Sequence, residues 1–250
     1  MKPQGSSYWV ESRQPLTSLV FIIPLLVFYE GGVVLLGPRA VRNGADVWLR
    51  GLLDLMGLGQ YFLLPILAVG ILLAWHHTTR KPWRVSRGVL SGMVVESLLL
   101  ALALRLILQL EILLWPGVGG PAAALGEPGS VEPGGAPALA GLVAFLGAGI
   151  YEELLFRLIL LSLAAWAARR MGAGQQAGTA AAVLATSLLF SAAHYLGPHG
   201  EPLLWLHWGF WFTAVFRLLA GVFFSLLFVY RGFGIAVGAH AGYDVLVKLL

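Results

Sequence analysis

Long apolar segments follow one another along most of the chain, and they restrict its fold more than any other feature. A helix that crosses a bilayer needs about 20 mostly apolar residues, and seven windows lie near that length. The windows are Leu16–Leu36, Leu52–Trp75, Val89–Trp115, Ala138–Ala168, Ala177–Tyr195, Trp208–Tyr230 and Gly232–Leu250. We therefore predict an all-α fold, a polytopic transmembrane helical bundle with seven spans. An eighth span inside one of the longer windows stays open.

The composition supports a membrane setting. Of the 250 residues, 58% are hydrophobic and 11% are charged, whereas a typical soluble domain carries about 25% charged residues. A soluble core of this size could not bury so much apolar surface, so the bilayer is the expected solvent. The chain has no cysteine, which excludes disulfides, thiolate metal sites and a cysteine nucleophile.

The basic residues give a net charge of +4, but they lie mostly in short loops between the apolar windows. This placement indicates membrane topology rather than nucleic-acid binding, because lysine and arginine favour cytoplasmic loops. The loops after the second and fourth windows are basic, at residues 80–87 and 169–170, which predicts an inside N-terminus and an outside C-terminus. The first loop, with Arg39, Arg42 and Arg50, runs against that orientation. We expect an integral protein of the bacterial inner (cytoplasmic) membrane.

A segment rich in glycine, proline and alanine, Pro116–Pro137, separates the third window from the fourth. Such a composition predicts a mobile loop. It divides the chain into a three-span N-terminal region, residues 1–137, and a four-span region, residues 138–250. We expect the two regions to form one integrated membrane domain.

Three charged residues interrupt the fourth window: Glu152, Glu153 and Arg157. Each ionisable group at the centre of a span costs about 2.5–3.5 kcal/mol on insertion scales, so their presence needs an explanation. Residues four apart share a helix face, and Glu153 is therefore expected to pair with Arg157. Successive residues point about 100° apart, which leaves Glu152 on a neighbouring face as a carboxylate suited to general-base chemistry.

Two later windows carry matching polar groups. Phe190 and His194 lie one turn apart in the fifth window, and His240 and Asp244 lie one turn apart in the seventh. Together with Glu152, these groups would suit activated-water chemistry. A lone membrane histidine is more often a satisfied interhelical hydrogen bond, and a Glu–Arg pair can be a structural bridge or a transporter's proton site. These simpler interpretations weaken when the three clusters are considered together.

In these segments the chain resembles the CPBP family, which includes the CAAX prenyl endopeptidases and bacterial abortive-infection proteins. The family pattern is E-E-x-x-x-R, then F-x-x-x-H, then H-x-x-x-N or H-x-x-x-D. The matching segments are Glu152-Glu153-Leu-Leu-Phe-Arg157, Phe190-Ser-Ala-Ala-His194 and His240-Ala-Gly-Tyr-Asp244. The resemblance covers Ala138 to Leu250, and it implies a glutamate-dependent intramembrane endopeptidase.

The resemblance also implies roles for the site residues. Glu152 would activate water, His194 would hold and polarise that water, and His240 with Asp244 would stabilise the oxyanion. The family often has asparagine at the last position, which donates a hydrogen bond. Asp244 donates only when it is protonated, and otherwise it would orient His240. The supporting positions are Glu153, Arg157 and Phe190.

The resulting prediction is an intramembrane endopeptidase that hydrolyses a peptide bond in a membrane-associated substrate, with exported proteins as candidates for processing or sorting. Its partners are that protein or peptide substrate and the lipid bilayer. No cofactor is expected, but a zinc site stays open, with the ligands Glu152, His194, His240 and Asp244. The alternatives are a non-enzymatic polytopic scaffold and a proton-coupled transporter, although the chain lacks the paired broken half-helices typical of transporters.

Overall fold

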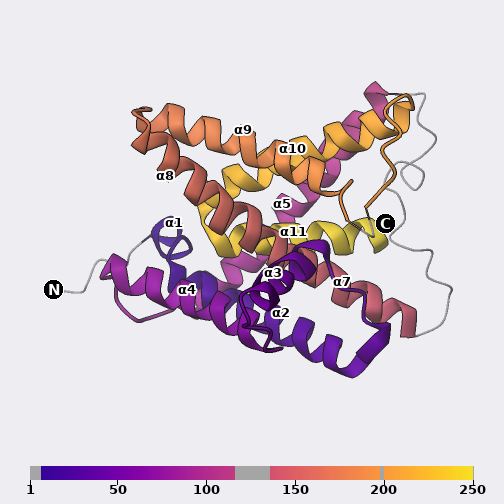
Figure 1. The fold of residues 1–250 in the computed structure, drawn as a ribbon. Coiled ribbons are helices and arrows are strands. Elements are labelled where there is room, and N and C mark those ends of the chain that lie inside the picture. Colours follow the sequence, from indigo (N-terminus) through magenta and orange to yellow (C-terminus); the bar gives the residue numbers. More distant parts are fainter. Residues whose placement is uncertain (1–6, 116–135, 198–199, 250) are drawn as a thin grey trace.

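The computed structural model describes residues 7–115, 136–197 and 200–249. Within these ranges the chain forms helices and connecting turns and contains no β-strand, in agreement with the all-α prediction (Figure 1). The helices are α1 (Tyr8–Glu11), α2 (Pro15–Leu36), η1 (Gly37–Arg39), α3 (Gly44–Leu55), α4 (Leu63–Thr79), α5 (Arg87–Leu114), α7 (Ala136–Glu152), η2 (Glu153–Leu161), α8 (Ser162–Arg170), α9 (Gln175–Ala193), α10 (Trp208–Arg231) and α11 (Phe233–Leu249).

Five helices of the described chain are long and apolar enough to cross a membrane. They are Pro15–Leu36, Arg87–Leu114, Leu139–Arg170, Gln175–Ala193 and Trp208–Arg231. The helix α4 is apolar but has 17 residues, and α11 has the same length. The chain is thus an integral membrane protein in which five of the seven predicted windows meet these criteria and two are shorter.

The second predicted window, Leu52–Trp75, is wrong as a single helix. The helix α3 ends at Leu55, and α4 begins only at Leu63. Between them Gly57 has a φ of 74°, a left-handed conformation that glycine adopts at little cost and that ends helices. The start of α3 also lies earlier than the window, so that the predicted first loop is largely helical.

The fourth predicted window is one continuous helix that runs through α7, η2 and α8. Its middle section, η2, is a π-helix rather than an α-helix. Such segments, with i→i+5 hydrogen bonds, are rare and occur frequently at functional sites. The predicted loop Pro116–Pro137 lies outside the described residues except for Ala136 and Pro137, which begin α7.

Large apolar side chains cover the outside of the bundle. On α5, for example, Leu106 is 63% exposed and Leu113 is 74% exposed. Soluble monomers rarely expose continuous apolar faces of this kind. In a bilayer the same faces contact lipid tails, as expected for membrane-spanning helices.

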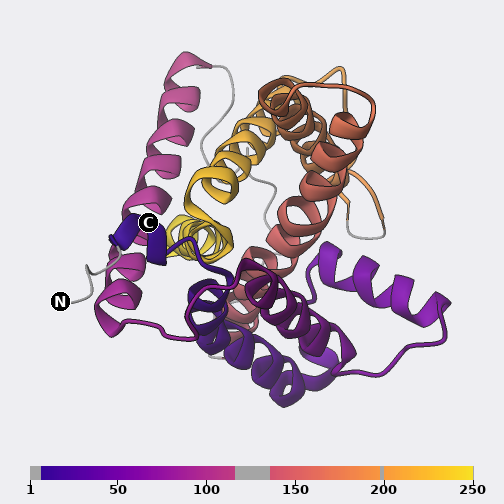
Figure 2. The same ribbon diagram turned by 90° about the vertical axis from the view of Figure 1, so that its left-hand side faces the viewer.

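The last helix, α11, lies inside the bundle, where it packs against α2, α5, α7 and α10. Both views place it, in yellow, between α5 and α7 (Figures 1 and 2). Glycines 234, 238 and 242 recur on one of its faces, a pattern that lets helices approach closely. A Cβ at Gly238 would lie 2.5 Å from Ser97 Oγ of α5 and 2.8 Å from the ring of Phe21 of α2. The glycine face of α11 therefore packs directly on α2 and α5.

One hydrophobic core joins the two regions of the chain. It contains buried residues of α2, α4, α7 and α11, such as Tyr29, Leu72, Ile150 and Val237. The N-terminal helices therefore pack directly on the segment that carries the charged residues of the fourth window.

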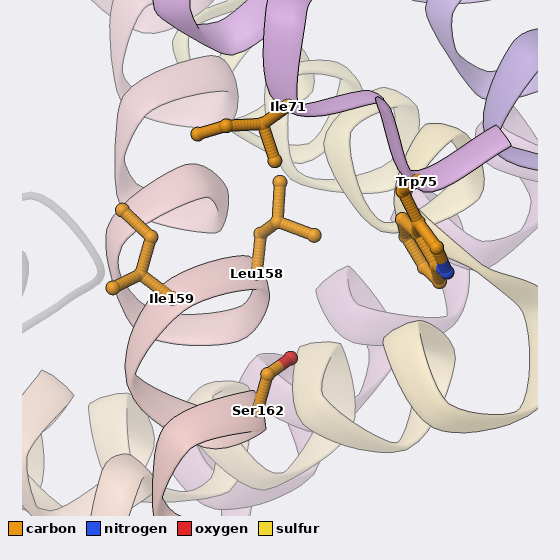
Figure 3. Close-up of a pocket in the computed structure, with 5 residues that line it drawn as sticks. All are labelled: Ile71, Trp75, Leu158, Ile159 and Ser162. Atoms are coloured by element: carbon orange, nitrogen blue, oxygen red, sulfur yellow. The ribbon is translucent and has the colours of Figure 1, made fainter. Parts of the chain in front are cut away.

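A shallow apolar hollow of about 280 Å³ lies between α4 and the helix formed by η2 and α8. Figure 3 shows Ile71 and Trp75 on one side of it and Leu158, Ile159 and Ser162 on the other. None of the charged residues of the fourth window lines this hollow. The polar cluster must therefore be described from its own contacts.

Candidate active site

A buried charge cluster lies where η2 meets α11. Glu153 is 0% exposed and Arg157 is 1% exposed. They form the ion pair expected from their spacing, with 3.0 Å between Arg157 Nη1 and Glu153 Oε1. His240 Nδ1 lies 2.7 Å from the same glutamate oxygen. Glu153 thus holds a guanidinium and an imidazole together through its Oε1, while its Oε2 makes no hydrogen bond within the described residues.

Aromatic rings surround the Arg157 guanidinium. Its Cζ lies 4.3 Å from the ring centre of Phe190, 5.4 Å from that of Phe224 and 5.9 Å from that of Phe156. Cations are attracted to such ring faces, and Nη2 also donates a 3.3 Å hydrogen bond to the carbonyl of Gly221. The helices η2, α9 and α10 therefore meet around this one side chain.

Glu152 ends α7 and has different neighbours from Glu153. The residue is buried, at 8% exposure, and its Oε1 accepts a 2.6 Å hydrogen bond from Asn43 Nδ2. Its Oε2 lies 3.8 Å from His240 Nε2, which is beyond hydrogen-bond distance. Within the described chain no arginine or lysine forms a salt bridge with Glu152. The two adjacent glutamates thus differ as helix geometry predicts, because Glu153 is paired with Arg157 and Glu152 is not.

His240 is held in one orientation by two contacts. Its ring stacks on Phe224, with the ring centres 4.3 Å apart and an interplanar angle of 13°. An ionised carboxylate only accepts hydrogen bonds, so Nδ1 carries the proton shared with Glu153. Its Nε2 then faces Glu152 Oε2 at 3.8 Å and Asp244 Oδ2 at 3.7 Å. The structure therefore brings three of the four predicted catalytic residues together around Nε2.

His194 follows the end of α9. Its Nδ1 lies 2.8 Å from the Phe190 carbonyl oxygen, and because a carbonyl only accepts, Nδ1 is the donor and Nε2 stays available. The Phe190 ring contacts both histidines, with centres 4.9 Å from His194 and 6.2 Å from His240. No direct hydrogen bond joins His194 to Glu152 in the described part of the chain. The fourth predicted residue is thus connected to the others through Phe190.

Sequence patterns did not point to Asn43. It lies outside the three motifs and outside every predicted window, yet it donates a 2.6 Å hydrogen bond to Glu152. Its side-chain Oδ1 also accepts from Ala45 N at 2.7 Å and so caps the start of α3. Asn followed by a helix is a common cap signal, but that signal says nothing of a contact with Glu152.

A buried polar network ties α3 to the segment before Glu152. Asp46 accepts hydrogen bonds from Tyr29 at 2.9 Å and from Arg50 at 2.7 Å. Arg50 also forms a 3.0 Å salt bridge with Glu30, and Glu30 accepts from the hydroxyl of Tyr151, the neighbour of Glu152. Arg50, which runs against the predicted topology, therefore has a structural role in the network.

The described residues do not fit a metal site. No group of three or more His, Asp or Glu side chains among them is arranged to hold a metal ion. The zinc ligands proposed from the sequence are therefore not gathered into metal-binding geometry.

Comparison with protein families agrees with the motifs at this site. The family described as type II CAAX prenyl endopeptidase, Rce1-like, matches residues 134–246. Residues 134–246 are an Rce1-like CAAX prenyl endopeptidase domain. No curated protein and no solved structure matches the chain. The Rce1-like domain contains all four predicted catalytic residues, whereas Asn43 lies outside it. A domain of this family indicates a protease with a protein substrate.

Proposed function

We propose that the protein is an intramembrane endopeptidase in which Glu152 activates water for hydrolysis of a peptide bond. The observation that carries this proposal is the difference between the two adjacent glutamates. Glu153 is occupied by Arg157 and His240, whereas Glu152 is buried and directs Oε2 towards His240 Nε2 without an arginine or lysine partner. A general base needs a lone pair that is not held in a close hydrogen bond to a cation, and Glu152 Oε2, which lies 3.8 Å from His240 Nε2, meets this condition.

In the proposed reaction the water oxygen attacks the carbonyl carbon of the substrate while Glu152 takes a proton from the water. His194 accepts a hydrogen bond at Nε2 from the second O–H of that water, because its Nδ1 is held by the Phe190 carbonyl. His240 donates from Nε2 to the oxyanion as an imidazolium, since Nδ1 remains bound to Glu153. Asp244, when protonated, donates beside it. Glu152 then passes its proton to the leaving nitrogen as the C–N bond breaks.

We further propose that α4 and α11 also cross the membrane, which gives seven spans. Helices of 17 residues are about 26 Å long at 1.5 Å per residue, close to the ~30 Å hydrocarbon core. The core shared by α2, α4, α7 and α11 supports treating residues 1–137 and 138–250 as one integrated domain. With seven spans, the basic loops lie on the cytoplasmic side, as expected for a bacterial inner membrane protein. In this orientation His194 lies near the outer face.

An outward-facing site would process or sort exported proteins. Mass spectrometry of protein termini in a deletion strain tests this assignment. Changed termini in exported proteins are expected. Changes confined to cytosolic peptides would contradict the outward-facing site.

A peptidase assay with the full chain in lipid bilayers tests the reaction itself. Glu152→Gln is expected to abolish cleavage of membrane-anchored peptides without lowering expression, and chelator is expected to have no effect. The matched control is Asp54→Asn, the same carboxyl-to-amide change at an exposed position, which should cleave like the wild type. Full activity of the Glu152→Gln protein would refute the proposal. Proton transport without cleavage would favour the transporter alternative, and neither activity would favour a scaffold.

A further inference from the structure

We propose that Asn43 is a positioning residue that fixes which oxygen of Glu152 acts as the base. The proposal rests on the function proposed above for Glu152. Asn43 belongs to the N-terminal region, outside residues 134–246 that match the Rce1-like family. The family match therefore assigns it no role.

Both ends of the Asn43 amide are engaged. Oδ1 accepts from Ala45 N at 2.7 Å, and Nδ2 donates to Glu152 Oε1 at 2.6 Å. A carboxylate oxygen and a backbone N–H can each form a hydrogen bond with only one end of an amide, so rotating the amide by 180° would lose both bonds. The side chain thus has one productive orientation, which the start of α3 sets.

Asn43 caps α3, and this helix is itself anchored to its surroundings. Asp46, one turn further along α3, is 0% exposed and binds Arg50 at 2.7 Å. Arg50 binds Glu30, which accepts from the hydroxyl of Tyr151. Catalytic groups work best when their orienting partners are held by rigid elements. Asn43 therefore contacts Glu152 from a helix that is also bound, through this network, to the residue before Glu152.

The hydrogen bond from Asn43 gives the two oxygens of the Glu152 carboxylate different surroundings. Oε1 is occupied by Asn43, and Oε2 faces His240 Nε2 at 3.8 Å. The oxygen that takes the proton from water is then Oε2, on the same side as His240 and Asp244. Because reactions depend steeply on the placement of the reacting atoms, loss of this contact should slow the chemical step rather than weaken substrate binding.

The test separates this role from helix capping. Serine caps helices about as well as asparagine, but its shorter side chain lacks the amide that reaches Glu152. Asn43→Ser is therefore expected to lower kcat ~10–100-fold, with KM unchanged and a smaller drop in melting temperature than Asn43→Ala. Asn43→Ala should lower both kcat and the melting temperature, because it also loses the cap. The control is Gly44→Ala, whose added Cβ meets nothing within 4 Å and which should match the wild type.

A second measurement does not need cleavage. A hydrophobic carbodiimide adds to carboxyl oxygens, and mass spectrometry of the modified peptide gives its rate of reaction with Glu152. Asn43→Ser should accelerate this reaction severalfold, because Oε1 loses its donor. Wild-type kcat together with a wild-type labelling rate in Asn43→Ser would overturn the role of Asn43 and leave the proposed peptidase intact. A wild-type chain that cleaves nothing would overturn the peptidase, and the labelling rates would still decide whether Asn43 holds Glu152.

Discussion

Glu153→Gln and Glu152→Gln make the same chemical change at adjacent positions, yet we expect them to differ strongly in stability. Glu153→Gln leaves the Arg157 guanidinium buried, at 1% exposure, without its counter-charge. Glu152→Gln removes no arginine partner, and the new amide oxygen can still accept the hydrogen bond from Asn43. The first change should therefore destabilise the fold, and the second should mainly stop catalysis.

The magnitude follows from the geometry of the ion pair. Two unit charges at the 3.0 Å separation of Arg157 and Glu153 interact by about 5.5 kcal/mol at an effective dielectric constant of ~20. Removing one partner of a buried pair destabilises proteins by about 3–5 kcal/mol. For Glu152→Gln the loss is about 1 kcal/mol, the weakening of one hydrogen bond. The two variants should thus differ by about 2–4 kcal/mol in the free energy of unfolding.

Denaturant unfolding of the full chain in mixed micelles measures this difference. A double variant, Glu153→Gln with Arg157→Met, supplies the control, because removing both charges of a buried pair is often close to neutral. We expect it to recover most of the stability that Glu153→Gln loses. Equal stability of the two single glutamine variants would refute the assignment of Glu153 as the structural carboxylate.

Two further predictions concern the surroundings of the site. Gly149→Ala should lower the free energy of unfolding by about 1–3 kcal/mol, because its Cβ would lie 2.8 Å from the backbone nitrogen of Ala241. Gly31→Ala, with nothing within 4 Å of its Cβ, should show no such loss in the same assay. Asp244→Asn should keep kcat within about tenfold of the wild type, because an asparagine can donate beside His240 Nε2. A folded Asp244→Asn protein that cleaves nothing would show that the negative charge is required.

The parts of the site that depend on local spacing could be predicted from the sequence. Residues four apart on a helix meet wherever the helix lies, so the pairing of Glu153 with Arg157 followed from their positions alone. The placement of α2, α5, α9 and α10 followed from the length of their apolar runs. The split between α3 and α4 was missed because a hydropathy window averages over the short break at Gly57, whose backbone conformation ends the helix.

The contact between Asn43 and Glu152 could not be predicted in this way. It joins residues 109 positions apart, and it depends on how α3 packs against α7. The π-helical geometry of η2 was also invisible, because its apolar sequence suits an α-helix equally well. Both features arise from tertiary packing, which a single sequence does not specify through spacing or composition.

The π-helical section Glu153–Leu161 also bears on how the length of this helix can vary. Each i→i+5 turn holds one more residue than an α-helical turn, so the section already accommodates an extra residue without a loop. Deleting one residue there should therefore return the helix to α geometry, whereas the same deletion in a regular α-helix would turn everything after it by about 100°. Arg157 lies inside the section, so the position of such a deletion decides its effect. A deletion after Arg157 would keep its four-residue spacing from Glu153, whereas one between the two residues would break the ion pair and move the guanidinium out of its aromatic surroundings.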